Sequence, residues 1–74
     1  MNGIKKDHYH YAIAHLPSGR IHKTSAYGTK HALIIAHRLS LNACRDVEVR
    51  AVRRMKSGEA VVQRVFVNGK VKAD

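Results

Sequence analysis

Four stretches of the chain have the length and the apolar–polar pattern of β-strands. Residues 8–16 are too short for a confident helix and rich in aromatic and strand-compatible residues, and residues 20–26 follow the next turn as the returning strand. Residues 46–55 alternate valine and alanine with charged residues, the period of a half-buried strand. Half of residues 60–67 are valine and one is phenylalanine, a composition typical of strands. The pattern therefore predicts two pairs of strands, separated by the segment 27–45.

Each predicted pair of strands is joined by a loop that contains Ser-Gly. Proline in the Pro-Ser-Gly segment at 17–19 presets φ for the second turn position, and glycine can adopt the left-handed conformation after it. This segment predicts a three-residue hairpin loop, and the similar segment at 55–59 predicts a second one. Asn68-Gly69 is a strong two-residue hairpin signal, so a short edge strand is expected at 70–72.

The segment between the two hairpins has helical spacing over residues 30–44, with Thr29 as a suitable N-cap. Its predicted sheet-facing residues are Ala32, Ile35, Ala36, Leu39 and Ala43. The element order is thus ββαββ. The expected fold class is α+β, an antiparallel sheet with one helix packed on one face and a short C-terminal edge strand.

If both loops hold three residues, positions of equal parity share a face of the sheet. The odd-numbered face is expected to support the helix: Tyr9, Tyr11, Ile13, Ile21, Tyr27, Val47, Val49, Ala51, Val61, Val65 and Val67. The even-numbered face is expected to be open: His8, His10, Arg20, His22, Thr24, Arg50, Arg54, Arg64 and Phe66, mixed with Ala12, Ala14, Val52 and Val62. A one-residue error in a loop would exchange a strand's faces.

The length of 74 residues is enough for one core and no second domain. We expect a flexible N-terminal segment at 1–7, a single α+β domain at 8–72 and a tail at 73–74. Cys44 is the sole cysteine, so no internal disulfide can form. No apolar stretch resembles a signal peptide or a membrane span, which indicates a cytoplasmic protein without membrane contact.

Charge is the strongest compositional signal. Fourteen lysines and arginines oppose five acids, which gives a formal net charge of +9 and a pI near 10.3. Such an excess favours polyanionic partners, although a well-solvated basic surface has the same composition. The six histidines add further positive charge in mildly acidic conditions.

The even-numbered face is the leading candidate for binding nucleic acid. Its arginines would contact phosphates and Phe66 would offer a surface on which bases stack. The candidate residues there are Arg20, His22, Arg50, Arg54, Arg64 and Phe66. Gly28, Thr29 and Lys30 at the helix start form a second candidate, because a helix N-terminus binds anions. The alternatives are an ordinary solvated sheet face and a simple Thr29 cap.

The helix carries a second apolar stripe. Ile34 and Leu41 lie nearly opposite its predicted sheet-facing side, with Arg38 in the polar arc close by. A helix that is apolar on two sides usually has two neighbours, which favours a homodimer or a protein interface. Two scattered exposed aliphatic residues are the alternative.

Two functions from different classes therefore remain. The first is a small nucleic-acid-binding domain, for DNA or RNA, that contacts phosphates largely without sequence specificity. The second is a small protein-binding inhibitor or adaptor that presents its basic face to an acidic or nucleic-acid-handling protein. In size and economy the chain is similar to phage-encoded inhibitors such as anti-CRISPR proteins, a likeness of architecture that no motif carries.

Catalysis and metal binding find little support in the sequence. His8, His10 and His22 could share a face, but no cysteine pair or nearby carboxylate completes a metal site. The five acids are dispersed, and Cys44 is expected to be a small buried residue rather than a nucleophile. We expect no enzyme activity, no cofactor and no metal.

Overall fold

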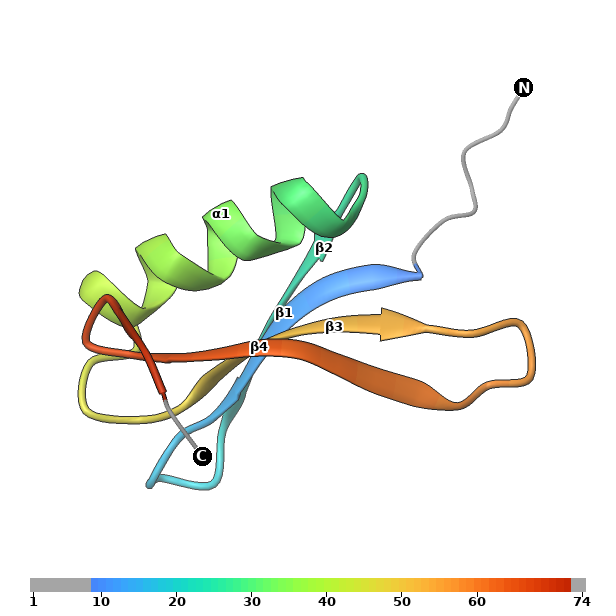
Figure 1. Ribbon diagram of the computed structural model, residues 1–74. Coiled ribbons are helices and arrows are strands. Elements are labelled where there is room, and N and C mark those ends of the chain that lie inside the picture. Colours follow the sequence, from blue (N-terminus) through green and yellow to red (C-terminus); the bar gives the residue numbers. More distant parts are fainter. Residues whose placement is uncertain (1–8, 73–74) are drawn as a thin grey trace.

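The computed structural model describes residues 9–72, which form a five-stranded antiparallel sheet with one helix on one face (Figure 1). The elements are β1 (His10–His15), β2 (Ile21–Ala26), α1 (Thr29–Leu41), β3 (Val49–Arg54), β4 (Ala60–Val67) and β5 (Lys70–Val71), and the strand order is β2-β1-β3-β4-β5. The predicted α+β class, the ββαββ order and the short C-terminal strand are confirmed. The expected segment 1–7 and tail 73–74 lie outside the described residues. No helix within 9–72 is long and apolar enough to cross a membrane.

The two long hairpins close with the same loop geometry. In the first, the Leu16 N–H donates to the Arg20 oxygen at 2.8 Å, and Gly19 has a φ of 95°. In the second, the Met55 N–H donates to the Glu59 oxygen at 2.7 Å, and the Ser-Gly glycine again has a φ of 95°. Glycine supplies a left-handed conformation that other residues rarely adopt. Both three-residue loops are therefore confirmed.

The helix starts and ends earlier than the sequence predicts. Gly28, not Thr29, is the N-cap, because the Gly28 oxygen accepts the first helical hydrogen bond from the Ala32 N–H at 2.9 Å. The helix ends at Leu41 instead of residue 44. The chain then stays close to the last turn, since the Cys44 N–H donates to the Leu39 oxygen at 2.7 Å.

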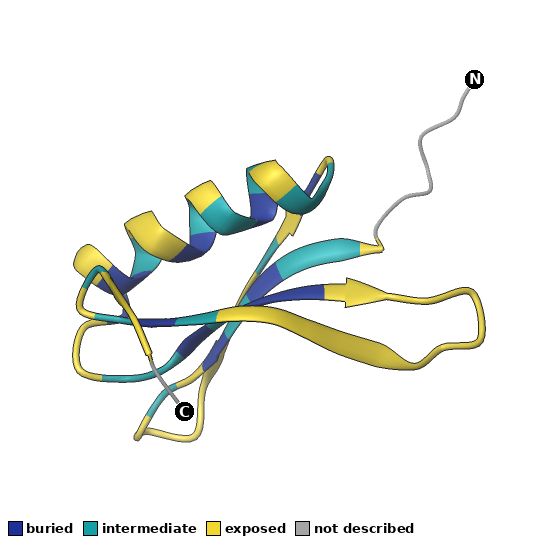
Figure 2. Ribbon diagram, viewed as in Figure 1, coloured by how far each residue is buried: buried dark blue, intermediate teal, exposed yellow. Residues whose placement is uncertain are grey.

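The helix meets the sheet through small side chains. Its fully buried residues are Ala32, Ala36 and Ser40, spaced four apart, whereas the predicted Ala43 is exposed. The sheet opposes them with buried Ala12, Ala14 and Ala51, and Val49 and Phe66 complete the core. Figure 2 shows the buried stripe along the side of α1 that faces the sheet. Small residues on both surfaces let the backbones approach closely.

Ser40 fastens the C-terminal turn to the helix. Its hydroxyl donates to the His37 oxygen at 2.7 Å and accepts a hydrogen bond from the Gly69 N–H at 2.9 Å. Gly69 has a φ of 82°, and a Cβ at this position would collide with the Leu41 side chain. Asn68 also has a positive φ, of 51°, so the turn has the left-handed pair expected for Asn-Gly.

The predicted assignment of the two sheet faces is wrong for β1 and β2. Both hairpin registers are as expected, for example Ala14 opposite His22. The β1–β3 ladder, however, joins residues of opposite parity, such as Ala12 with Ala51. Even-numbered residues of β1 therefore share a face with odd-numbered residues of β3. The helix covers the even positions of β1, which the hairpin loops alone could not reveal.

A bulge in β4 changes the faces a second time. Ala51 pairs with Arg64 but Val52 pairs with Val62, so Gln63 is an extra residue in β4. Beyond the bulge, Phe66 pairs with buried Val49. Arg64 and Phe66 consequently lie on the helix-covered side, and not on the open face where the sequence places them.

Ser40→Ala should lower the free energy of unfolding by about 1 kcal/mol, because it leaves the partly buried Gly69 N–H without its acceptor. In a domain of this size, each 1 kcal/mol corresponds to a fall in Tm of roughly 4–8 °C. Thermal and denaturant unfolding would measure the loss. Ser25→Ala, at an exposed position of β2, is the control, and equal stability of the two variants would contradict the role of Ser40.

Candidate nucleic-acid interface

The sheet face opposite α1 gathers basic side chains from several strands. Alternation along each strand and the pairings between strands assign residues to this helix-free face. Its cations are Lys23, Arg50, Arg54, Lys70 and Lys72, and its other members include Tyr11, Ile13, Glu48, Val52, Val62 and Val65. The cations extend from β2 at one edge of the sheet to β5 at the other.

Apolar side chains lie between these cations. Tyr11 and Ile13 are half-buried, and Val52 is buried although no helix covers it. Val52 lies between its cross-strand neighbours Tyr11 and Val62. Long basic side chains commonly lay their apolar stems over such surface while keeping the charge in water. The helix-free face is thus a basic surface on an apolar base.

Lys23 is held over the ring of Tyr11. Its Nζ lies 4.4 Å from the ring centroid, within cation–π range. The contact joins β2 to β1 and fixes one positive charge on the helix-free face.

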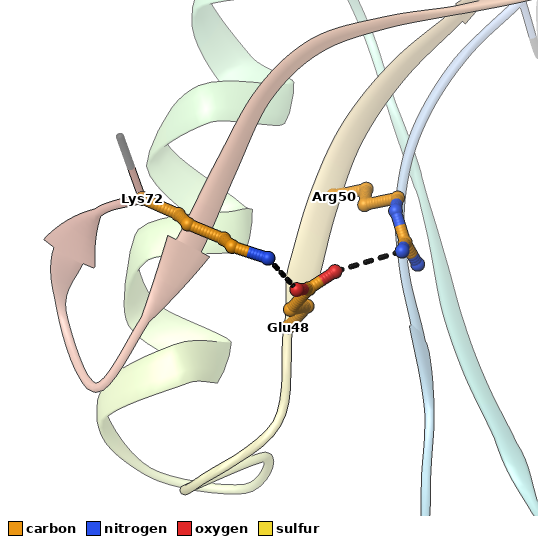
Figure 3. A network of polar contacts seen from close by, with 3 residues as sticks. All are labelled: Glu48, Arg50 and Lys72. Atoms are coloured by element: carbon orange, nitrogen blue, oxygen red, sulfur yellow. Dashed lines mark hydrogen bonds and ion pairs between the residues drawn. The ribbon is translucent and has the colours of Figure 1, made fainter. Parts of the chain in front are cut away.

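Glu48 is the acidic member of this face (Figure 3). Its carboxylate accepts a hydrogen bond from Arg50 Nη2 at 2.8 Å and a second one from Lys72 Nζ. The hydrogen bond and charge of Lys72, and then the charge of Arg50, lower the pKa of Glu48 from its ordinary value of 4.5. The network ties the end of β5 to the start of β3 across β4, and it partly neutralises two of the cations.

The structure brings together only some of the predicted binding residues. Arg50 and Arg54 share the helix-free face, as expected. His22 and Arg64 lie on the opposite side of the sheet, and Arg20 ends the first loop. Phe66 is only 6% exposed and packs edge-to-face against a histidine of α1, so it cannot stack on bases. The predicted six-residue cluster therefore does not exist as one surface.

The predicted anion site at the helix start has a different arrangement from the one expected. Gly28 caps the helix without a side-chain hydrogen bond, Thr29 is already helical, and Lys30 is exposed. Tyr27 is 97% exposed and stacks on His31, with ring centroids 5.1 Å apart. The Tyr27 N–H donates to His31 Nδ1 at 3.0 Å, so a side chain already serves one of the N–H groups here.

The second apolar stripe of the helix is partly a structural contact. Leu41 lies directly over Gly69 and helps to hold the C-terminal turn. Ile34 is 49% exposed and Arg38 is exposed. Of the two aliphatic residues in the predicted interface, Leu41 thus contacts the C-terminal turn, whereas Ile34 projects outward from the helix.

Sequence reasoning missed a groove at a step in the sheet. The groove has a volume of about 310 Å³ and lies where β1 begins, beside the end of β3 and the first residues of the loop that follows it. Its lining residues are Tyr9, His10, Arg53, Arg54, Met55 and Lys56. The sequence shows Lys56 as a charged residue of the second loop, but it predicts Tyr9 on the face that supports the helix. Only the β1–β3 register reveals that Tyr9 lies opposite Arg54.

The described residues contain no group of three metal-ligating side chains. His10 and His22 are near opposite ends of the β1–β2 ladder, and His8 lies outside the described part of the chain. Cys44 is buried, as the sequence predicts, and burial raises the pKa of its thiol. The thiol is consequently kept protonated and poorly nucleophilic.

Comparison with known proteins adds nothing to this geometry, because no family model, no curated protein and no solved structure matches the chain.

Glu48→Gln should make the stability of the domain less dependent on acid pH. Because the folded pKa of Glu48 is lowered, its ionised form stabilises the fold above the ordinary value of 4.5, and this stabilisation is lost as the pH falls through the lowered pKa. Tm measured from neutral to acid pH should fall less in the variant than in the wild type. Glu59→Gln removes an exposed loop carboxylate and is the control. An unchanged Tm profile in Glu48→Gln would contradict the network.

Proposed function

We propose that this protein is a nucleic-acid-binding domain that contacts phosphates through the helix-free face, largely without sequence specificity. The observation that carries the proposal is the gathering of Lys23, Arg50, Arg54, Lys70 and Lys72 on a sheet face that the helix leaves uncovered. Glu48 is the acidic side chain that the described strands and their flanks place on that face.

The dimensions of this face suit a polyanion. Neighbouring strands are about 4.8 Å apart, so Lys23 on β2 and Lys70 on β5 are separated by roughly 19 Å across the sheet. Phosphates along one strand of a duplex are about 3.4 Å apart along the axis. The face therefore spans several phosphates, and the planar forks of Arg50 and Arg54 can contact phosphate oxygens in a bidentate manner.

Phosphate contacts fix the position of a nucleic acid but carry no sequence information directly. The helix, which could enter a major groove, lies on the other side of the sheet and packs against it. Weak sequence preference follows from this arrangement. The net charge of +9 would favour fast association with any polyanion in the cytoplasm, where we expect the protein to act without a cofactor.

A second candidate is a small inhibitor or adaptor whose basic face meets an acidic protein surface. The exposure of Ile34 on the outer side of the helix favours it, because a phosphate binder does not need an aliphatic side chain there. This candidate includes a homodimer formed through the helix.

Binding to DNA or RNA should weaken steeply with salt. The log–log slope should become shallower by about 0.7 to 0.9 for each phosphate contact that is removed. Lys23→Gln with Lys70→Gln removes two charges from the helix-free face and should reduce the slope accordingly in fluorescence anisotropy titrations. Arg38→Gln with Arg45→Gln removes the same charge from exposed positions outside that face and is the control.

Two outcomes would contradict the proposed function. One is the absence of binding to any nucleic acid at low salt. The other is an equal effect of the two double variants, because the helix-free face would then contribute no more than general charge.

Ile34→Glu tests the second candidate. If a protein partner or a second copy binds the outer side of α1, this buried charge should abolish the association, because an unpaired charge in an interface is costly. Sedimentation or size-exclusion measurements with and without nuclease treatment would show it. Lys30→Gln, also exposed on α1, lowers the net charge by the same one unit and is the control. An unchanged mass and unchanged partners would exclude an interface at Ile34.

A further inference from the structure

The groove at the start of β1 lies at a step in the sheet. β1 pairs with β3 from Ala14 to His10, opposite Arg53, and the Arg54 N–H then donates to the Tyr9 oxygen at 2.5 Å. Beyond Tyr9, the described part of the chain has no strand beside β3 on this edge, and the hairpin of β3 and β4 continues without it (Figure 1). Among residues 9–72, the step leaves one side of the hairpin without a neighbouring strand at the groove.

The lining of the groove combines aromatic, apolar and cationic groups. Tyr9 is 42% exposed and Met55 38% exposed, so a ring and a thioether are accessible. Arg53, Arg54 and Lys56 surround them, and none of the lining residues is an acid. A flat aromatic ligand with an attached negative charge fits this combination, since rings stack on tyrosine and phosphates bind arginine and lysine.

We propose that the groove binds one unpaired nucleotide of a nucleic-acid strand, with the base stacked on Tyr9 and the adjoining phosphates contacted by Arg53, Arg54 and Lys56. This inference rests on the proposed function and adds a preference to it. Phosphate contacts on the helix-free face alone do not distinguish single strands from duplexes, whereas a stacking site for a base does.

The geometry favours an unpaired base. Bases in a duplex are already stacked on both sides, so a protein ring can stack on one only after the base leaves the helix. Tyr9 is exposed at a step where no other described strand lies beside the end of β3, so a single base can stack on its ring. The main-chain hydrogen bond from Arg54 holds the Tyr9 backbone in place, so the ring is presented from an ordered position.

The groove is continuous with the helix-free face. Tyr9 and Arg54 are opposite each other on that face, while His10 and Arg53 form the corresponding pair on the other side of the sheet. Tyr11 follows Tyr9 on the same face, but its ring is covered by Lys23. A strand whose phosphates contact Arg54 on the helix-free face can therefore reach the base site at Tyr9 without leaving that face.

The test compares a fluorescently labelled single-stranded DNA oligonucleotide with the duplex of the same length and sequence, by anisotropy at low salt. Tyr9→Ala should weaken binding of the single strand roughly tenfold, in the range measured for loss of one stacking partner, and should leave duplex binding unchanged. Tyr9→Phe should retain wild-type affinity, because stacking needs the ring and not the hydroxyl. Thermal unfolding of each variant would show that the fold is intact.

Tyr27→Ala is the matched control: Tyr27 is more exposed than Tyr9 and follows Ala26, the partner of His10, but its ring stacks on His31 and it does not line the groove. Arg53→Gln should also weaken single-strand binding, whereas Arg45→Gln, in the loop after α1, should have only the effect of one general charge. Arg53 lies off the helix-free face, so its effect reports on the groove alone.

Equal effects of Tyr9→Ala and Tyr27→Ala, or an equal loss of single-strand and duplex binding in Tyr9→Ala, would overturn the inference. The proposed function would survive either result if the Lys23 and Lys70 double variant still reduced binding. If the wild-type protein bound neither oligonucleotide, both the proposed function and the inference about the groove would be contradicted.

Discussion

The contact between small residues of the helix and small residues of the sheet determines most of this structure. Ala32, Ala36 and Ser40 can lie directly on the central strands only because the sheet presents alanines beneath them. Larger side chains fill the margin of this contact, where Phe66 packs below the last turns of the helix. The core is consequently thin. A chain of this length gains its stability from close packing of small side chains and not from a large buried volume.

A thin core on one side leaves the other side of the sheet to the solvent. Half of the positions of each strand then need no apolar side chain, and here they carry most of the strand-borne positive charge. Charged groups on an open face keep their hydration, so they cost the folded domain little desolvation free energy. Glu48 limits the repulsion among them by pairing with Arg50 and Lys72. The packed core and the basic surface are therefore on opposite sides of the same strands.

Local signals predicted most of the fold, and non-local pairing accounts for most of the errors. The Ser-Gly and Asn-Gly turns fixed three connections correctly, because a turn depends on a few adjacent residues. The β1–β3 register joins segments about 40 residues apart, and no turn specifies it. The bulge at Gln63 leaves no clear mark in a run of valines. For the site, the sequence places Arg50 and Arg54 on the correct face. Tyr9 is predicted on the wrong face because of the β1–β3 register, and Phe66 because of the bulge.

The alanine contact also has a consequence for how such a chain can change over generations. Any enlargement of Ala12, Ala36 or Ala51 would push the helix off the sheet, so selection should hold these positions small. Apart from Val52 and its half-buried neighbours, the alternate positions of the same strands are not constrained in this way. Descendants of this sequence could exchange one class of ligand for another by altering every second residue, while the packed side of the domain stays the same.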